Sequence, residues 1–556
     1  MPDEARQLNQ LHLTTFSPTI ACKVPMSYYH APAKALICAL GFAVMTANAA
    51  MASESAVPAP QSSIVQTQVM VKAVEFSGNR AFTSEQLSEQ IIGELGRPMS
   101  LAEIKALAAK VEAYYHRANY RLVKVVVPAQ NFAAERALKL VVLEGWLGNV
   151  QVTGANRFSS EQVINALAAG GVVEGKPFTL EQVERSLTHL NRLSGVTVSS
   201  TLQPGAQTGS TDLLVEVTEA PRVQGAMEAN NYGSKDTGET RVIPSLKFAN
   251  LTGHGDEANV MALTSVGDGD LWYGYVDYSL PLNAQGTKTR AYFSKGNVDV
   301  GNTYRVLEIQ GDNQSWGLGV SQDFVLSARR IVTAEAWLES QDLEQSILGV
   351  RTAEDKIRKL RLSLNLDNSD LYGRTLASTG LHYGLGEALG GMDDESLMSS
   401  RAAAKADNKF TKFTFDIARL QQITQRLLLI PRIAGQYSLD SLVSSEQWGV
   451  GGFHSVVGHA PSTWSGDHGF TASLEGRYSL FKDSDRYQAT ARIDHGQVWL
   501  KDTLIGQDDH QDLTGAAVGM LARPIDSVDL RVDVGVPLSE KTEDSTYVYA
   551  QARYRF

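Results

Sequence analysis

The last ten residues alternate strictly between two kinds of side chain. One face of an extended strand carries Val548, Ala550, Ala552, Tyr554 and Phe556. The other face carries Tyr549, Gln551, Arg553 and Arg555. An apolar face toward lipid and a charged face toward water predict a strand of a transmembrane β-barrel. In a soluble β-sandwich the apolar face would pack in a core instead, but the secretory N-terminus and the absence of cysteine after position 38 favour the barrel.

The same alternation runs through residues 224–556, in short segments separated by Gly, Asp and Asn turns. Asp268-Gly269, for example, is a hairpin signal. No stretch beyond the N-terminal region approaches the ~18 apolar residues of a membrane helix, so a membrane crossing requires strands. About sixteen segments fit, and bacterial barrels close with an even number, so we predict a membrane all-β barrel of 16 antiparallel strands over 222–556.

The N-terminus has the organisation of a secretory signal peptide. Translation starting at Met26 would place an apolar run at 35–45 before the cleavage motif Ala47-Asn48-Ala49. A membrane anchor is the alternative, although the run is short for a bilayer span. We predict a signal peptide over 1–49 and a flexible lead-in, rich in Ala, Pro, Ser and Gln, over 50–68.

An internal repeat occupies residues 69–220. Each copy has the order strand, helix, helix, strand, strand, and each helix begins with a capping-box pattern. The four patterns are Thr83/Gln86, Ser100/Glu103, Ser159/Gln162 and Thr179/Gln182. We therefore predict two α+β domains, over 69–145 and 146–221.

Little in the chain suggests chemistry. A net charge of −11 argues against a nucleic-acid partner. The segment 170–176 nearly spells a phosphate-binding loop, but Pro177 stands where Ser or Thr must hold magnesium, so it reads as a link between two helices. His454, His459 and His468 share one long loop, where solvated side chains are more common than a metal site. We expect no enzyme activity, no cofactor and no metal.

Five short motifs follow one another in the C-terminal half. A Gln-Tyr-Ser strand at 436–438 precedes a Gly-Gly entry and a Val-Val-Gly-His tip within 451–459. Ser-Gly-Asp-His-Gly follows at 465–469 and Ile-Asp-His-Gly-Gln-Val at 493–498. In this order and spacing they resemble the two-partner secretion transporters, also called haemolysin secretion/activation proteins, and the paired α+β domains resemble POTRA domains.

The resemblance implies a set of functional positions. It places a long loop, about 438–468, inside the barrel lumen as a gate. Its tip would be Gly451, Gly452, Ser455, Val456, Val457, Gly458 and His459. The strand on which it docks would carry Asp494 and Gly496, and the loop exit would be Gly466, Asp467 and Gly469. Tyr554 and Phe556 would form the C-terminal barrel signal.

Two positions depart from the family pattern. The family's tip arginine falls on Val457 and its aromatic residue on His459. Since that arginine would reach Asp494, this carboxylate needs another donor, water or a proton, with His459, His468 and Arg477 as candidate partners. We also expect Val457→Arg to restore the pair and to raise export. The Pro-containing lead-in indicates that the family's N-terminal plug helix is absent or short.

The resemblance implies an outer-membrane transporter that secretes a large partner exoprotein, such as an adhesin or haemolysin. Exposed sheet edges of the periplasmic POTRA domains would capture the unfolded partner, which would then pass through the barrel. Outer-membrane lipid and the barrel-assembly machinery that inserts the protein would be further partners. The alternatives are an outer-membrane assembly factor (insertase) and a passive porin, although a porin needs no periplasmic arm.

Overall fold

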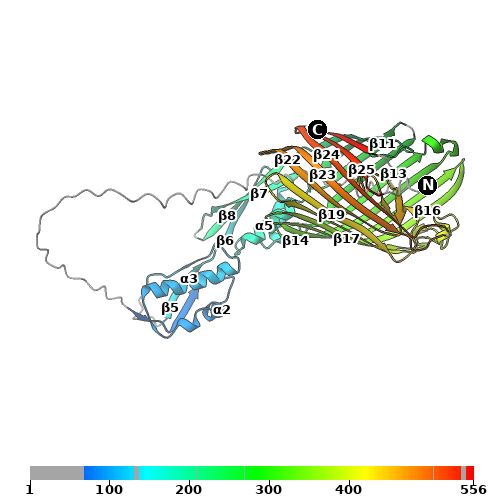
Figure 1. The fold of residues 1–556 in the computed structure, drawn as a ribbon. Coiled ribbons are helices and arrows are strands. Elements are labelled where there is room, and N and C mark those ends of the chain that lie inside the picture. Colours follow the sequence, from blue (N-terminus) through cyan, green and yellow to red (C-terminus); the bar gives the residue numbers. More distant parts are fainter. Residues whose placement is uncertain (1–67, 131–136, 208, 268, 505, 540–545) are drawn as a thin grey trace, which may run out of the picture.

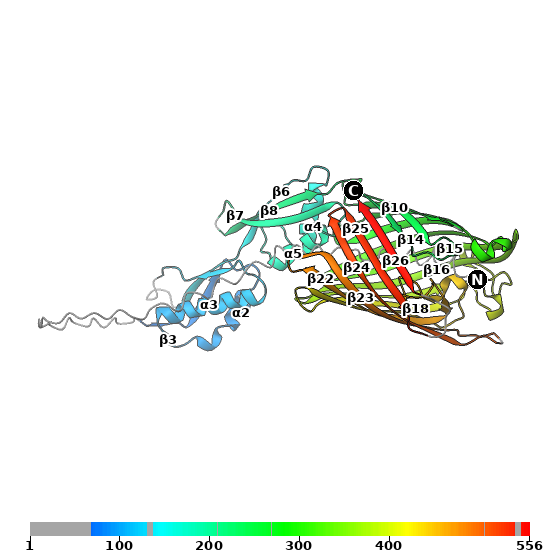
Figure 2. The same cartoon turned by 45° about the horizontal axis from the view of Figure 1, so that its top comes forward.

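The computed structural model describes residues 68–130, 137–207, 209–267, 269–504, 506–539 and 546–556. The predicted signal peptide, the start at Met26, the lead-in up to residue 67 with its plug helix, and Asp268 of the hairpin signal lie outside these residues. Within the described ranges, no helix combines the length and the apolar character needed to cross a membrane. The chain forms two small α+β domains followed by a barrel (Figures 1 and 2).

The barrel is closed and has sixteen antiparallel strands, as the alternating segments predicted. Its strands are β9 (Val223–Asn230), β10 (Thr240–Ala249), β11 (Glu257–Val266), β12 (Asp270–Pro281), β13 (Thr287–Asp299), β14 (Gln310–Ser327), β15 (Arg330–Ile347), β16 (Val350–Ser369), β17 (Gly373–Gly384), β18 (Thr411–Gln422), β19 (Leu427–Ser438), β22 (His468–Phe481), β23 (Ser484–Trp499), β24 (His510–Ile525), β25 (Val528–Pro537) and β26 (Tyr547–Arg555). Pairing of β26 with β9 closes the cylinder. Short 3₁₀ segments in the loops are η3 (Asn302–Leu307), η4 (Ala388–Gly390) and η5 (Ala402–Ala404).

The two faces of β26 differ as the alternation predicted. Val548 and Tyr554 are 56% and 50% exposed on the outer face, whereas Tyr549 is 4% exposed on the inner one. Charged side chains pair across the inner face of other strands, for instance Arg361 with Glu339 at 3.0 Å. The barrel therefore has an apolar exterior that suits lipid and a charged, wet interior.

The first α+β domain has a three-stranded sheet in the order β2-β5-β4, covered by helices. Its elements are β1 (Val69–Met70), β2 (Ala73–Ser77), α2 (Ser84–Glu89), η2 (Ile92–Glu94), β3 (Pro98–Met99), α3 (Leu101–Arg117), β4 (Lys124–Val126) and β5 (Ala137–Leu143). The second domain repeats this sheet as β6-β8-β7. It comprises β6 (Trp146–Thr153), α4 (Ser160–Ala169), α5 (Leu180–Leu190), β7 (Val196–Pro204) and β8 (Ser210–Glu219), so 170–177 does link two helices. Apolar residues between sheet and helices form a separate core in each domain.

The repeat extends further than the capping motifs. Glu144, just after β5, accepts hydrogen bonds from the backbone N–H groups of Arg80 and Ala81. Glu219, at the end of β8, accepts them from Asn156, Arg157 and Phe158. In both domains a carboxylate thus holds the turn that precedes the first helix, by accepting hydrogen bonds from its backbone N–H groups.

Three of the four predicted capping boxes are present, at Thr83, Ser100 and Thr179. The prediction at Ser159 is wrong, because the Ser159 side chain makes no capping hydrogen bond. In a capping box, the Gln162 side chain would accept a hydrogen bond from the backbone N–H of Ser159. This N–H instead donates to the carbonyl of Gly253 at 3.0 Å. Gly253 lies in the β10–β11 turn, so a contact with the barrel replaces the local cap.

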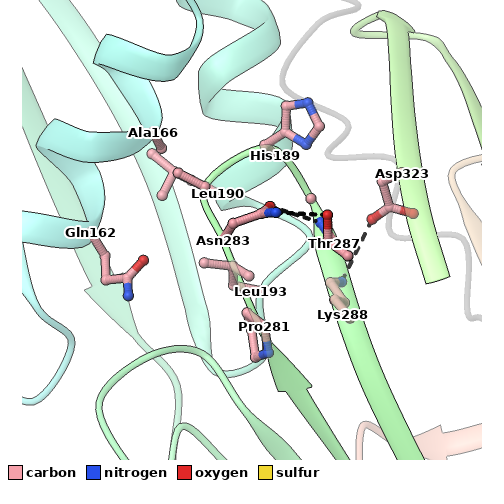
Figure 3. A pocket seen from close by; sticks show the side chains of 12 residues that line it. Gln162, Ala166, His189, Leu190, Leu193, Pro281, Asn283, Thr287, Lys288 and Asp323 are labelled. Atoms are coloured by element: carbon pink, nitrogen blue, oxygen red, sulfur yellow. Dashed lines mark hydrogen bonds and ion pairs between the residues drawn. The ribbon is translucent and has the colours of Figure 1, made fainter. Parts of the chain in front are cut away.

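The second domain sits directly on one end of the barrel (Figures 1 and 2). Arg192, just after α5, makes two bonds to the carboxylate of Asp323 on β14, at 2.7 and 2.8 Å. Lys288 on β13 donates to the Arg192 carbonyl at 3.1 Å and lies 3.6 Å from Asp323. In Figure 3, His189 and Leu190 of α5 line a small pocket together with the β12–β13 turn.

Candidate functional site

The loop between β19 and β22 is folded and lies inside the barrel. It contains η6 (Ser444–Glu446) and a hairpin formed by β20 (Trp448–Val450) and β21 (Trp464–Gly466). The tip of this hairpin, residues 451–463, packs against β23, β24, β25 and β26. We call residues 451–463 the tip and the remainder of 439–467 the base.

Glycines shape the tip from within. Gly451, Gly452 and Gly458 have φ values of 114°, 87° and 82°, a region that favours glycine. The Gly452 N–H donates to the carbonyl of His459 at 3.1 Å, and the Ser455 N–H donates to the carbonyl of Gly452 at 3.1 Å. The tip therefore has its own hydrogen bonds and forms a compact unit.

Backbone groups of the tip bond to the barrel wall. The Val457 N–H donates to Asp494 Oδ2 at 3.1 Å, and the Gly458 N–H donates to the hydroxyl of Tyr549 at 3.0 Å. His459 Nε2 lies 3.0 Å from the carbonyl oxygen of Thr514. These bonds attach the tip to three strands, β23, β24 and β26.

Three wall glycines make room for this close approach. A Cβ atom at position 515 would lie 1.8 Å from the Val457 carbonyl oxygen, and one at 496 would lie 2.9 Å from Val456 Cγ2. At position 535 it would lie 3.0 Å from the Gly458 nitrogen. Of these glycines the sequence analysis identified only Gly496. The other two could have been found from the sequence, because each of three neighbouring strands has a glycine on its inward face.

Asp494 is paired with Arg492, a residue that the sequence analysis did not consider. Arg492 Nε donates to Asp494 Oδ1 at 2.7 Å, and its other nitrogens donate to the carbonyls of Phe453 and Ser455 at 2.8 and 3.0 Å. Residues two apart in a strand share a face, which was the missed signal. The positive charge that the resemblance led us to expect on the loop thus lies on the barrel wall.

The three predicted donors to Asp494 are therefore wrong. His459 contacts Thr514, and the imidazole of His468 accepts from the Ser438 N–H at 3.1 Å. Arg477 donates to Glu475 at 2.8 Å. In the described part of the chain, no group of three His, Cys, Asp or Glu side chains is arranged to hold a metal ion.

Val457 packs in an aromatic cluster rather than pointing at a charge. Its side chain is fully buried among Tyr232, Phe453, Ala517 and Tyr549. The rings of Tyr232 and Phe453 stack at 4.0 Å with an angle of 13°. This apolar packing removes the structural basis for the expected pairing of an arginine at 457 with Asp494.

The base is held by charged side chains of its own. Glu446 lies 2.6 Å from the ammonium nitrogen of Lys359 on β16 and 2.7 Å from that of Lys412 on β18. Asp467 pairs with Arg401, which comes from the loop between β17 and β18. Asp467 also accepts from the N–H groups of Leu442 and Lys501, at 2.9 and 3.0 Å.

The remaining predicted positions lie at the strand ends. Gly466 and Gly469 flank Asp467 at the end of β21 and the start of β22, and a Cβ at either would meet Trp499 or Trp448 within 2.5 Å. At the other end of the barrel, the Gly225 N–H donates to the Phe556 carbonyl at 2.9 Å. The Phe556 ring covers Gly225, where a Cβ would lie 2.3 Å from the ring.

Comparisons with known proteins agree with this architecture. Residues 209–522 match the family model described as haemolysin secretion/activation protein ShlB/FhaC/HecB, and residues 69–145 match the POTRA domain, ShlB-type. The chain is 23% identical over 406 residues to the heme/hemopexin transporter protein HuxB of Haemophilus influenzae, covering 72% of this chain and 70% of that protein. It is 25% identical over 415 residues to the outer membrane transporter CdiB of Dickeya dadantii, with the same coverage of 72% and 70%.

A solved structure is similar over nearly the whole chain. CdiB from Escherichia coli superposes with a TM-score of 0.73 at 21% identity, covering 90% of this chain and 93% of that chain. At this identity the likeness concerns the fold. A POTRA-plus-barrel architecture is thus common to both.

Proposed function

This chain belongs to the haemolysin secretion/activation protein family, and on that premise we propose how it moves its partner. It is an outer-membrane transporter of two-partner secretion with POTRA domains in the periplasm, and it secretes a large partner exoprotein. It is neither an insertase nor a porin. The proposed route has two steps: capture of the unfolded partner on a sheet edge, and passage through a lumen from which the loop tip withdraws.

The best edge for capture is β7 of the second POTRA domain. The strand lies at the end of its sheet, and its Val198 N–H and carbonyl bond to the side chain of Asn191, at 2.6 and 3.0 Å. Backbone groups of alternate residues point to the same side of a strand, so those of Ser200 and Leu202 face outward as well. An extended partner segment could pair with β7 beyond the Asn191 side chain.

A proline at position 200 tests this step. Ser200→Pro removes an outward N–H without touching the bonds to β8, a change that edge strands tolerate. Secretion of the partner should fall at least tenfold in Ser200→Pro and stay unchanged in the matched variant Ser200→Ala, which keeps the N–H. Equal secretion by both variants would reject β7 as the capture edge.

The observation that carries the second step is the attachment of the tip to the lumen wall. With the tip bonded to β23, β24 and β26, the loop fills space through which a polypeptide would pass. Export therefore requires the tip to leave. Because the chain outside its first 38 residues has no cysteine, engineered disulfides report on this movement without background.

A disulfide between tip and wall provides the test. In Val456→Cys/Gly496→Cys the two Cβ atoms are close, since the Cβ at 496 lies 2.9 Å from a Val456 methyl group, and a disulfide needs roughly 3.5–4.5 Å between Cβ atoms. The oxidised protein should lose export and regain it on reduction. Export by each single cysteine variant should not change between oxidising and reducing conditions, and Gly496→Cys alone reports any effect of the crowding that a Cβ at 496 causes. Export that continues with the disulfide formed would refute the gate.

Two further partners belong to the proposal. The exposed apolar side chains on the outer face of the barrel, such as Val548 and Tyr554, fit outer-membrane lipid. The terminal strand ending at Phe556 fits recognition by the barrel-assembly machinery. Deleting Phe556 should lower the amount of protein in the outer membrane, measured by fractionation.

A further inference from the structure

Tip and base are attached to the barrel by different kinds of contact. The charged residues that contact the tip, Arg492 and Asp494, both belong to the wall strand β23 and pair with each other at 2.7 Å. Besides the apolar contacts of Phe453 and Val457, the tip contributes backbone N–H groups and carbonyls and no charged partner to these ion pairs. When the tip withdraws, water and the exported chain can replace those bonds, and the Arg492–Asp494 pair stays intact.

The base contributes charges of its own. Glu446 is 2% exposed and Asp467 is fully buried, while their cationic partners lie on other parts of the molecule. Withdrawing the base would separate the carboxylates of Glu446 and Asp467 from the cationic groups of Lys359, Lys412 and Arg401. Separating one partner of a buried ion pair is far more costly than breaking hydrogen bonds to backbone groups.

The outer loop, residues 385–410 between β17 and β18, adds to the hold on the base. Ser400 Oγ accepts from the Ser444 N–H at 3.0 Å, and the Arg401 guanidinium donates to the Leu442 carbonyl at 2.6 Å. Leu442 and Val443 pack against apolar residues of this loop and of β16. The base is therefore clamped between the barrel wall and a second loop.

We propose that Lys359, Lys412 and Arg401 are positioning residues that keep the base fixed while the tip alone swings out, as a flap. The positive φ values of Gly451 and Gly452 at one border of the tip, and of Ser462 at the other, mark where the backbone can turn. This inference rests on the proposed withdrawal of the tip. It adds that the lumen opens by a hinged movement and not by expulsion of the whole loop.

A second disulfide, placed at the base, tests the hinge. Ser400→Cys/Ser444→Cys introduces two small changes where the Ser400 hydroxyl oxygen lies 3.0 Å from the Ser444 backbone nitrogen, and formation of the disulfide is checked by the gel mobility of the full-length protein. The ratio of partner secretion by oxidised and by reduced cells is compared with that of Val456→Cys/Gly496→Cys. We expect a ratio within twofold of one for the base disulfide and below one tenth for the tip disulfide.

The outcomes separate the two proposals. Equal loss of secretion with both disulfides means that the whole loop leaves, which overturns the hinge but preserves the gate. Undiminished secretion with the tip disulfide overturns the gate itself.

A charge variant tests the base independently of disulfide formation. Glu446→Gln removes the carboxylate that Lys359 and Lys412 share and so loosens the base, and the unitary conductance of the purified protein in planar bilayers should at least double. Conductance and secretion both equal to those of the unaltered protein would overturn the positioning role of the lysines.

Discussion

Replacing Arg492 by glutamine should release the tip from the barrel wall. Arg492 bonds to two tip carbonyls, at 2.8 and 3.0 Å, and to Asp494 at 2.7 Å, and its side chain is 10% exposed. Hydrogen bonds to a charged group contribute about 1.5–3 kcal/mol each. Losing both carbonyl bonds therefore weakens docking by about 3 kcal/mol at the least, and every 1.4 kcal/mol is a factor of ten.

The undocked fraction of the tip should thus rise roughly 100-fold. Single-channel recording of the purified protein measures this fraction as open probability. Arg374→Gln is the control, because Arg374 on β17 pairs with Asp367 on β16 at 2.6 Å, away from the strands that hold the tip. An unchanged open probability in Arg492→Gln, or an equal increase in Arg374→Gln, would refute the role of Arg492 in docking.

Three further predictions follow from the contacts. Val457→Arg should lower secretion by tenfold or more relative to Val457→Leu, because the side chain is buried and Asp494 is already paired; increased secretion on immunoblots would contradict this. Gly515→Ala should raise basal conductance, since its Cβ would overlap the tip, whereas Gly274→Ala in open space should not. Burial raises the pKa of Glu219, but hydrogen bonds from three backbone N–H groups and an arginine outweigh it and lower the pKa to about 2, from about 4.5. The second POTRA domain should therefore lose roughly 3 kcal/mol of stability as the pH falls from 4.5 to 2, and Glu219→Gln should abolish that dependence in hydrogen-exchange measurements.

Local patterns predicted the fold well. Strand alternation has a period of two and needs only neighbouring residues, so β26 and the strand number of the barrel could be predicted. Capping boxes span four residues, and three of them formed. The failure at Ser159 came from a long-range competitor, the carbonyl of Gly253 in the barrel, which no local pattern contains.

The site could be predicted only in part. The motifs located the loop and Asp494, because these residues follow one another in the chain. Arg492 could not be predicted from the motifs although it is two residues from Asp494, because the family pattern places the positive charge at position 457. Arg401 is held by a separate loop 66 residues from its partner Asp467, and nothing in the sequence links the two.

The contacts of the second POTRA domain with the barrel have a practical consequence for exchanging parts between transporters. Ser159 and Ser194 donate backbone hydrogen bonds to Gly253 and Gly255 in a single barrel turn, and Arg192 reaches Asp323 on the wall. A hybrid that joins this domain to a foreign barrel would lose all three attachments at once. Hybrid transporters should therefore be joined near residue 145, so that the second POTRA domain is transferred together with its own barrel.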